Sequence, residues 1–219
     1  MKINNRLKLV GDYVDKGSIP LDIGCDHAKL SIYLLKEKNF PFVYASDNKS
    51  GPLSQARENV NYYNLADRIE LIKAEGLNSL NDKIDTITVT GMGGLTINKM
   101  FLENRNKLTN IKTIILSPNN FIKEVRETIT ILGYYLKDEE LVEESDKLYH
   151  ILVFSKGDKI YSEEELYLGP ILMTKNKEII KRYYRNELSN INNLLLNKKI
   201  PKEKKEELRK LKKYLEDAC

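Results

Sequence analysis

The segment LDIGCDHA at residues 21–28 joins a short apolar run to a glycine turn, and a helix-forming sequence follows it. A strand that turns at a glycine into a helix is the opening unit of a parallel α/β sheet, and ligands bind at such strand ends. Dinucleotide folds use three glycines here to approach a pyrophosphate, but this turn has only Gly24, flanked by Asp22 and Asp26. Carboxylates repel a pyrophosphate and attract a cation. The turn therefore favours S-adenosylmethionine, whose ammonium and sulfonium groups are positive.

Short β-rich apolar runs alternate with helix-period segments on both sides of this turn, which is typical of parallel strands joined by crossover helices. The acidic segment EESDK at residues 143–147 separates the last two runs and suits a hairpin. We therefore predict an α/β domain with a mostly parallel seven-stranded sheet that ends in an antiparallel hairpin. The predicted strands are residues 19–23, 42–46, 69–73, 84–90, 111–116, 134–142 and 148–154.

The β pattern stops at Tyr161, so we predict two domains, residues 1–160 and residues 161–219. Ile200-Pro201 interrupts the apolar pattern of the second domain, and Leu208, Leu211 and Leu215 then recur in a lysine-rich segment. Two antiparallel helices that pack along one seam, as a coiled coil, are the simplest arrangement. The first would be one long amphipathic helix, whose apolar residues are Leu168, Leu172, Ile179, Tyr183, Leu188, Ile191 and Leu195.

The positive charge of the chain is concentrated in this C-terminal part. Residues 1–160 hold 22 basic and 22 acidic side chains, and residues 161–219 hold 14 basic and 10 acidic ones. Between residues 174 and 215 the imbalance is 14 basic against 5 acidic. Such a field favours a polyanionic partner, although an ordinary solvated helix face would have the same composition.

Composition excludes several classes of protein. No window approaches the roughly 18 consecutive apolar residues of a membrane span, and the first residues are charged where a signal peptide has an apolar core. Two cysteines, Cys25 and Cys219, and two histidines, His27 and His150, have no recognised metal-ligand spacing. We expect a cytoplasmic protein without metal or membrane, and a monomer is the favoured oligomeric state.

Each parallel strand ends in a polar or glycine motif. Asp47, followed by Asn48, ends the second strand, where an acidic side chain can accept hydrogen bonds from both ribose hydroxyls of an adenosine. Each motif alone is equally explained by turn chemistry, helix capping or packing, but together they favour a cofactor site. The remaining candidates are Glu75, Gly76 and Leu77 after the third strand, Gly91, Met92 and Gly93 after the fourth, and Asn119 after the fifth.

The run DIGCDHAKL at residues 22–30 resembles the DIGSDHAYLP block of the bacterial tRNA (adenine22-N1)-methyltransferase family. GMGG at residues 91–94 and SPNN at residues 117–120 resemble the AGMGG and QPN blocks of the same family, and weaker matches extend over the whole chain. This sequence has Asp47 where the family usually has Glu and Glu75 where it usually has Asp, so the charge is kept, whereas Lys29 replaces a usual Tyr.

The resemblance implies a class I, Rossmann-like methyltransferase domain that binds S-adenosylmethionine and methylates N1 of adenine 22 in tRNA. Under this reading Asp26, His27 and Asn119 are the candidate catalytic residues. Asp26 would stabilise the positive charge of the methylated adenine, and Asn119 would lie against the target nitrogen. His27 would be an orienting group or would accept a proton from the amino group of the adenine. The candidate tRNA-binding residues are Arg6, Lys175, Lys181, Arg182, Arg185, Lys198 and Lys199.

Three other functions fit parts of the pattern. A methyltransferase for another RNA or a small molecule, with a helical cap, would share the cofactor motifs. A non-catalytic RNA-binding module would retain the fold without turnover. A nicotinamide-dependent oxidoreductase is disfavoured because the triple-glycine motif is missing.

Overall fold

The structure is a computed structural model that describes residues 3–197 and 199–218. Within these residues the chain divides into two compact units, one that ends at Lys159 and one that begins at Ile160. The first unit contains α1 (Asn5–Asp12), β1 (Pro20–Ile23), α2 (Lys29–Lys36), β2 (Val43–Asp47), α3 (Ser50–Tyr62), β3 (Ile69–Lys73), β4 (Thr86–Thr90), α4 (Gly94–Glu103), β5 (Thr113–Ser117), α5 (Ile122–Ile131), β6 (Tyr134–Glu144) and β7 (Lys147–Lys156).

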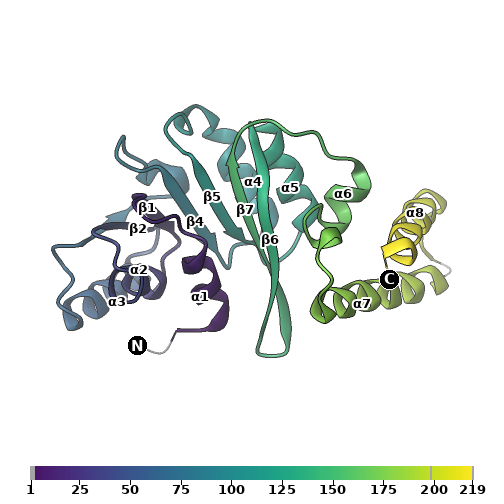
Figure 1. The fold of residues 1–219 in the computed structure, drawn as a ribbon, viewed down its shortest axis with the longest axis horizontal. Coiled ribbons are helices and arrows are strands. Elements are labelled where there is room, and N and C mark those ends of the chain that lie inside the picture. The colour runs from purple at the N-terminus through teal and green to yellow at the C-terminus, as the bar shows by residue number, and fades with distance from the viewer. Residues whose placement is uncertain (1–2, 198, 219) are drawn as a thin grey trace. The chain divides into compact units, whose positions relative to one another are not determined.

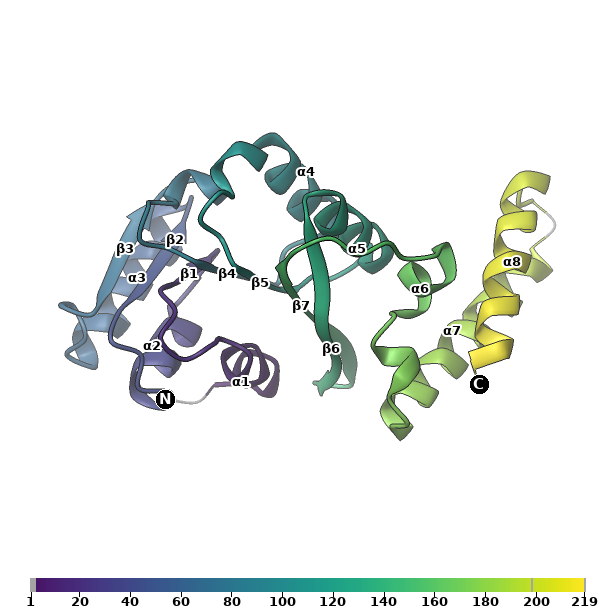
Figure 2. The same ribbon diagram turned by 45° about the horizontal axis from the view of Figure 1, so that its top comes forward.

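The seven strands form one sheet in the order β3-β2-β1-β4-β5-β7-β6. The first five strands of this order are parallel, and β7 pairs antiparallel with both β5 and β6. The predicted sheet and its antiparallel ending are confirmed. Helices α1, α2 and α3 cover one face, and α4 and α5 cover the other (Figures 1 and 2).

The parallel strands β1, β2, β4 and β5 are buried on both faces because helices cover each side of the sheet, whereas the edge strand β3 is partly exposed. All four residues of β1 and all five of β5 are buried. Because β1, β2, β3 and β4 run parallel, their carboxyl ends meet at one edge of the sheet. The motifs identified in the sequence follow these ends.

The predicted hairpin at residues 143–147 is also confirmed. Ser145 and Asp146 have φ values of 50° and 61°, the left-handed pair that a two-residue type I′ turn requires. Glu144 at the end of β6 accepts a hydrogen bond from the backbone N–H of Asn5 at 2.9 Å. The hairpin therefore contacts the start of α1, a helix that the sequence patterns did not single out.

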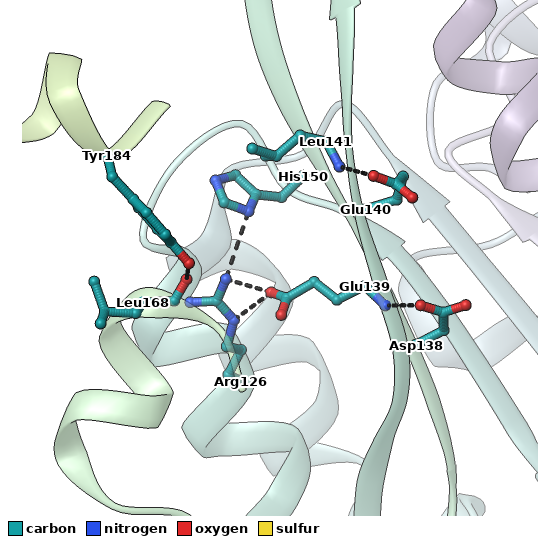
Figure 3. A network of polar contacts seen from close by, with 8 residues as sticks. All are labelled: Arg126, Asp138, Glu139, Glu140, Leu141, His150, Leu168 and Tyr184. Atoms are coloured by element: carbon teal, nitrogen blue, oxygen red, sulfur yellow. Dashed lines mark hydrogen bonds and ion pairs between the residues drawn. The ribbon is translucent and has the colours of Figure 1, made fainter. Parts of the chain in front are cut away.

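A buried ion pair joins α5 to β6 in the first unit (Figure 3). The Arg126 guanidinium donates to Oε1 of Glu139 through Nε at 2.7 Å and also through Nη2, and the two side chains are 2% and 0% exposed. Nδ1 of His150 on β7 lies 3.5 Å from the same guanidinium. Burial, and secondarily the Arg126 charge, lower the pKa of His150 well below its usual value, so this imidazole is neutral at pH 7.

The second unit contains α6 (Glu163–Leu168), α7 (Glu178–Leu196) and α8 (Lys202–Ala218). The prediction of one long helix from Leu168 to Leu195 is wrong. Helix α6 ends at Leu168 because Gly169 takes a φ of 99° and Pro170 has no N–H to continue a helix. A short 3₁₀ turn, Leu172–Thr174, precedes α7.

Helices α7 and α8 pack against each other, with Leu208 and Leu215 of α8 buried. The predicted apolar face of α7 is displaced by one position at its start: Ile180 and Tyr184 are buried, whereas Ile179 and Tyr183 are only partly so. The Tyr184 hydroxyl donates to the carbonyl of Leu168 at 3.1 Å, which ties α7 to the end of α6 (Figure 3). No helix among the described residues is long and apolar enough to cross a membrane.

Candidate active site

The turn between β1 and α2 has an unusual backbone. Gly24, Asp26 and Ala28 all have positive φ, at 72°, 49° and 55°, and only the first is a glycine. Non-glycine residues in this region are strained and persist only where their surroundings impose the conformation. Here the backbone N–H groups of Gly24 and Cys25 both donate to the carbonyl of Ser46, at 2.8 and 2.9 Å. Strain held in place at a strand end points to a functional loop.

Gly24 cannot be replaced by a larger residue without moving a neighbour. A Cβ at this position would lie 2.6 Å from Cε of Met92, and the φ of 72° disfavours any side chain. The β1 turn and the glycine-rich turn after β4 are therefore in close contact. Gly24, Asp26 and Met92 line two cavities of about 1100 and 610 Å³, which adjoin at these residues.

The larger cavity is lined by a carboxylate from each of three successive strand ends. Asp26 follows β1, Asp47 ends β2, and Glu75 follows β3. Oδ1 of Asp47 accepts a hydrogen bond from the backbone N–H of Lys49 at 2.9 Å, which orients this carboxylate at the cavity wall. Asn48 and Gly76 line the same cavity, as the sequence predicted.

The opposite wall of the larger cavity is a face of α4, which the sequence analysis missed. Motifs at strand ends identify only loops. A helix that begins at a glycine-rich turn beside the site could have been examined for residues at intervals of four, because these share one face. That pattern identifies Leu95, Thr96, Lys99, Met100, Glu103 and Asn104.

The smaller cavity lies between the start of α1, the β1 turn and the end of β4. Arg6, Asp22, His27 and Gly91 line it, together with Glu144 from the hairpin. The Arg6 guanidinium lies over the Tyr149 ring, 4.4 Å from its centre, and its buried Nε has no hydrogen-bond partner among the described residues. Arg6 thus belongs to the wall of the site, where its guanidinium can bind an anionic group.

Asp22 is almost fully buried, with 2% of its surface exposed. Its two carboxylate oxygens accept hydrogen bonds from Ser31 at 3.1 Å and from Thr88 at 3.2 Å. Burial raises the pKa of Asp22 to about 6, the charge of Asp47 adds to this increase, and the two hydroxyl donors oppose it. The carboxylate is therefore held in place by α2 and β4.

Asp26 and His27 form a pair at the junction of the cavities. Nε2 of His27 lies 3.4 Å from Oδ2 of Asp26, and the side chains are 39% and 68% exposed. The carbonyl of His27 accepts a hydrogen bond from Nδ2 of Asn59 in α3 at 2.9 Å, which anchors the residue in the turn. The Asp26 carboxylate is thus accessible from both cavities.

Three predicted site residues of the first unit line neither cavity. Nδ2 of Asn119 donates to the carbonyl of Gly91 at 2.6 Å, and its backbone N–H donates to the carbonyl of Met92 at 2.9 Å. Asn119 therefore supports the turn after β4. Gly93 lies within this turn, and Leu77, in the short 3₁₀ turn Gly76–Ser79 that follows β3, is completely buried.

The predicted tRNA-binding cations of the second unit are in or near α7. Lys181 and Arg185 both contact Glu178, at 3.5 and 3.3 Å. Arg182 and Lys199 are exposed, and Lys175 is partly exposed. Lys198 lies outside the described residues.

The two cavities fit S-adenosylmethionine better than a phosphate-bearing cofactor. The larger is lined by four carboxylates, including Glu103, and two ammonium groups, Lys49 and Lys99. The smaller is lined by three carboxylates and two basic side chains, Arg6 and Lys29. Both walls are net acidic and favour a cation over a pyrophosphate. Within the described part of the chain, no group of three or more His, Cys, Asp or Glu side chains has metal-binding geometry.

Comparisons with known proteins agree on one family. The model of the tRNA (adenine(22)-N(1))-methyltransferase family matches residues 20–218. The tRNA (adenine(22)-N(1))-methyltransferase of Bacillus subtilis is 30% identical over 195 residues, which cover 86% of this chain and 82% of that protein.

Solved structures show the same relationship. A putative tRNA (m1A22) methyltransferase from Streptococcus pneumoniae, in complex with S-adenosyl-L-methionine, superposes with a TM-score of 0.91 at 29% identity over 99% of both chains. M. capricolum TrmK, in complex with S-adenosyl-homocysteine, has a TM-score of 0.88 at 25% identity over 99% of this chain and 97% of that one.

Proposed function

The chain belongs to the tRNA (adenine(22)-N(1))-methyltransferase family, and from this premise we propose how its own residues bind the methyl donor and position the target base. The enzyme transfers a methyl group from S-adenosylmethionine to N1 of adenine 22 in tRNA. The observation that carries the proposal is the junction of two cavities at Gly24, Asp26 and Met92. We assign the larger cavity to the donor and the smaller one to the extruded base.

The strand ends supply the groups that hold the donor. We assign to Asp47 the role of accepting hydrogen bonds from the ribose hydroxyls of the donor. Glu75 would accept a hydrogen bond from the amino group of the donor's adenine. Gly24 and Gly76, with φ values of 72° and 51°, allow the backbone to come close to the ligand. When bound, S-adenosylmethionine supplies a methyl group on a positively charged sulfonium.

The smaller cavity is large enough for a nucleoside, since sites for small ligands typically span about 300 to 1000 Å³. N1 of adenine faces a pairing partner in folded tRNA, so the base must leave its stack to enter, at a cost of a few kcal/mol. Arg6, which lines this cavity, then lies where it can contact either a phosphate of the extruded nucleotide or the donor's carboxylate.

Positioning dominates the chemistry, because neutral adenine already has a lone pair at N1 and needs no base to become a nucleophile. Alignment of the reacting groups contributes on the order of 7 kcal/mol or more in well-oriented systems. The methylated base is cationic. Asp26, accessible from both cavities, stabilises that developing charge, and His27 orients the carboxylate through the 3.4 Å contact.

Affinity for S-adenosylmethionine should fall as the pH falls through about 6. Asp22 lines the smaller cavity next to the junction at Gly24 and Asp26, where we place the positively charged end of the donor. That cation favours the ionised form of Asp22, whose pKa is raised to about 6, so protons and the donor compete at this carboxylate. Calorimetric titration between pH 5 and 8 measures the effect. Asp22→Asn should bind more weakly at pH 8 and have a flatter profile than the wild type; an equally steep profile in this variant would assign the titration to another group.

The second unit supports tRNA binding by its charge. Residues 174–215 hold 14 basic and 5 acidic side chains, a field that attracts a polyanion. Binding energy gained there can offset the cost of extruding the base. A tRNA-modifying enzyme of this kind acts in the bacterial cytoplasm.

Labelled S-adenosylmethionine and total bacterial RNA provide the direct test. After digestion to nucleosides the label should appear as 1-methyladenosine, and primer extension on the treated tRNA should stop at position 22. A small-molecule methyltransferase would leave the RNA unlabelled, and a non-catalytic RNA-binding module would bind tRNA and donor without turnover.

A further inference from the structure

The lysine and arginine side chains of α8 fall into two sets. The first set is already paired with carboxylates. Lys204 contacts Glu207 at 2.7 Å, Lys212 contacts Glu216 at 3.5 Å, and Lys210 pairs with Glu163 of α6. These three cations are partly neutralised within the second unit.

The second set consists of Lys202, Lys205, Arg209 and Lys213. Across residues 3–197 and 199–218, no carboxylate oxygen lies within 4.0 Å of any of these four cations. Lys202, Arg209 and Lys213 are exposed, and Lys205 is partly exposed. Their charges are therefore available to a partner from outside the chain.

The four residues lie on one face of the helix. Their spacings of three, four and four residues place them in a single row, which we call the α8 cationic stripe. At 1.5 Å per residue the stripe extends over about 16 Å. Leu208 and Leu215 are buried, and the stripe lies about 120° around the helix axis from them, on an exposed flank of α8. Three exposed carboxylates lie beside it, Glu206, Glu216 and Asp217, and Glu216 already pairs with Lys212. The four cations of the stripe outnumber the other two carboxylates, so the local charge remains positive.

Helix α7 offers a contrast. Lys181 and Arg185, two of the cations expected to bind tRNA, share Glu178 as a partner. A cation already paired with a carboxylate exchanges one anion for another when it binds a phosphate. The favourable free energy of that contact is therefore smaller than for an unpaired cation. The unpaired row on α8 is therefore better suited to phosphates than the paired cations of α7.

We propose that the α8 cationic stripe is the surface of the second unit that contacts the phosphate backbone of tRNA. The proposal rests on the proposed function and adds which cations carry the binding. Phosphate contact releases condensed counterions and is independent of base sequence. It therefore suits a surface that binds tRNA while the first unit binds the target adenine.

An anionic membrane is a less suitable partner for the same charges. Helices that bind membrane surfaces place apolar side chains beside their cations, in the interface. On α8 the apolar side chains Leu208 and Leu215 are buried against the rest of the unit, and Leu211 is partly buried. The stripe lacks an apolar face to insert.

Two matched triple variants of the full chain test the proposal. The stripe variant is Lys205→Gln/Arg209→Gln/Lys213→Gln, and the control variant is Lys204→Gln/Lys210→Gln/Lys212→Gln. Each removes three positive charges from the same helix, so total charge is equal and only position differs. Circular dichroism melting must show comparable helicity in both, and each protein is titrated with unmodified tRNA at several salt concentrations.

The stripe variant should bind tRNA at least about tenfold more weakly, and the slope of log affinity against log salt should fall by about 2 to 3, since each phosphate contact contributes about 0.7 to 0.9. The control variant should change affinity by less than about threefold. In the stripe variant KM for tRNA should rise, while kcat at saturating tRNA and the affinity for S-adenosylmethionine stay unchanged.

Equal losses in the two variants would show that only total charge matters, and unchanged binding in the stripe variant would also overturn the proposal. Loss of binding to vesicles of phosphatidylglycerol and phosphatidylcholine, with tRNA binding intact, would assign the stripe to a membrane. These outcomes differ from failure of the proposed function, in which the wild-type protein itself forms no 1-methyladenosine in tRNA.

Discussion

Asp26→Asn should lower kcat for tRNA methylation by about 100-fold or more, while the dissociation constant of S-adenosylmethionine changes by less than about fivefold. Loss of a single group that stabilises transition-state charge costs about 10² to 10³ in kcat in comparable sites. Asp26 is suited to this role because it lines both cavities and its carboxylate is 68% exposed, so it is not held by the protein interior. The amide keeps the shape but loses the charge.

Single-turnover kinetics with saturating tRNA, together with calorimetric titration of the donor, separate the two effects. Asp47→Asn is the matched control, since it removes a carboxylate from the larger cavity only. It should weaken donor binding and leave kcat at saturation nearly unchanged. If Asp26→Asn instead abolishes donor binding, Asp26 holds the cofactor and the charge-stabilising role belongs elsewhere.

Glu139→Gln should destabilise the protein by about 3 to 5 kcal/mol, the typical cost of removing one member of a buried ion pair. Glu139 is the carboxylate that pairs with the buried Arg126, and neither side chain is more than 2% exposed. The amide removes the negative charge that Glu139 places against the buried guanidinium, and His150 beside it is neutral and cannot replace that charge. Urea unfolding followed by circular dichroism measures the loss.

Two further variants make this result specific. Glu216→Gln removes one partner of an exposed pair and should cost less than about 1 kcal/mol. Arg126→Met/Glu139→Met removes both buried charges and should recover most of the stability, because apolar side chains of similar volume replace an ion pair with little penalty. If Glu139→Gln unfolds at the same urea concentration as the wild type, the buried pair contributes nothing to stability.

The catalytic framework was predictable because its signals are local. Strands in a parallel sheet appear as short apolar runs, and the residues after each run lie at the same edge of the sheet. Asp26, Asp47 and Glu75 were therefore expected to lie close together, and they line one cavity. The hairpin was predictable for the same reason, since its turn chemistry is contained in residues 143–147.

The position of Asn119 after β5 does not by itself determine the role of its side chain. From the sequence this residue was a candidate for contact with the target nitrogen, but its amide donates to the carbonyl of Gly91, and the residue lines neither cavity. Strand order identifies which loops meet at one edge, whereas the direction of each side chain depends on backbone angles and competing partners. Arg6 was a candidate tRNA-binding residue from the sequence, but its place in the wall of the smaller cavity follows only from the tertiary structure.

The sequence alone determined the strand pattern, the acidic strand ends and the excess of positive charge near the C-terminus, because alternation of apolar residues, turn chemistry and composition are properties of neighbouring residues. Tertiary structure alone decided that α4 forms one wall of the larger cavity, that Arg126 and Glu139 meet in the interior, and which cations of α8 have a carboxylate partner. Each of these depends on contacts between elements far apart in the chain or on the rotation of a helix about its axis. Packing of the whole unit selects that rotation, and no short window of sequence contains it.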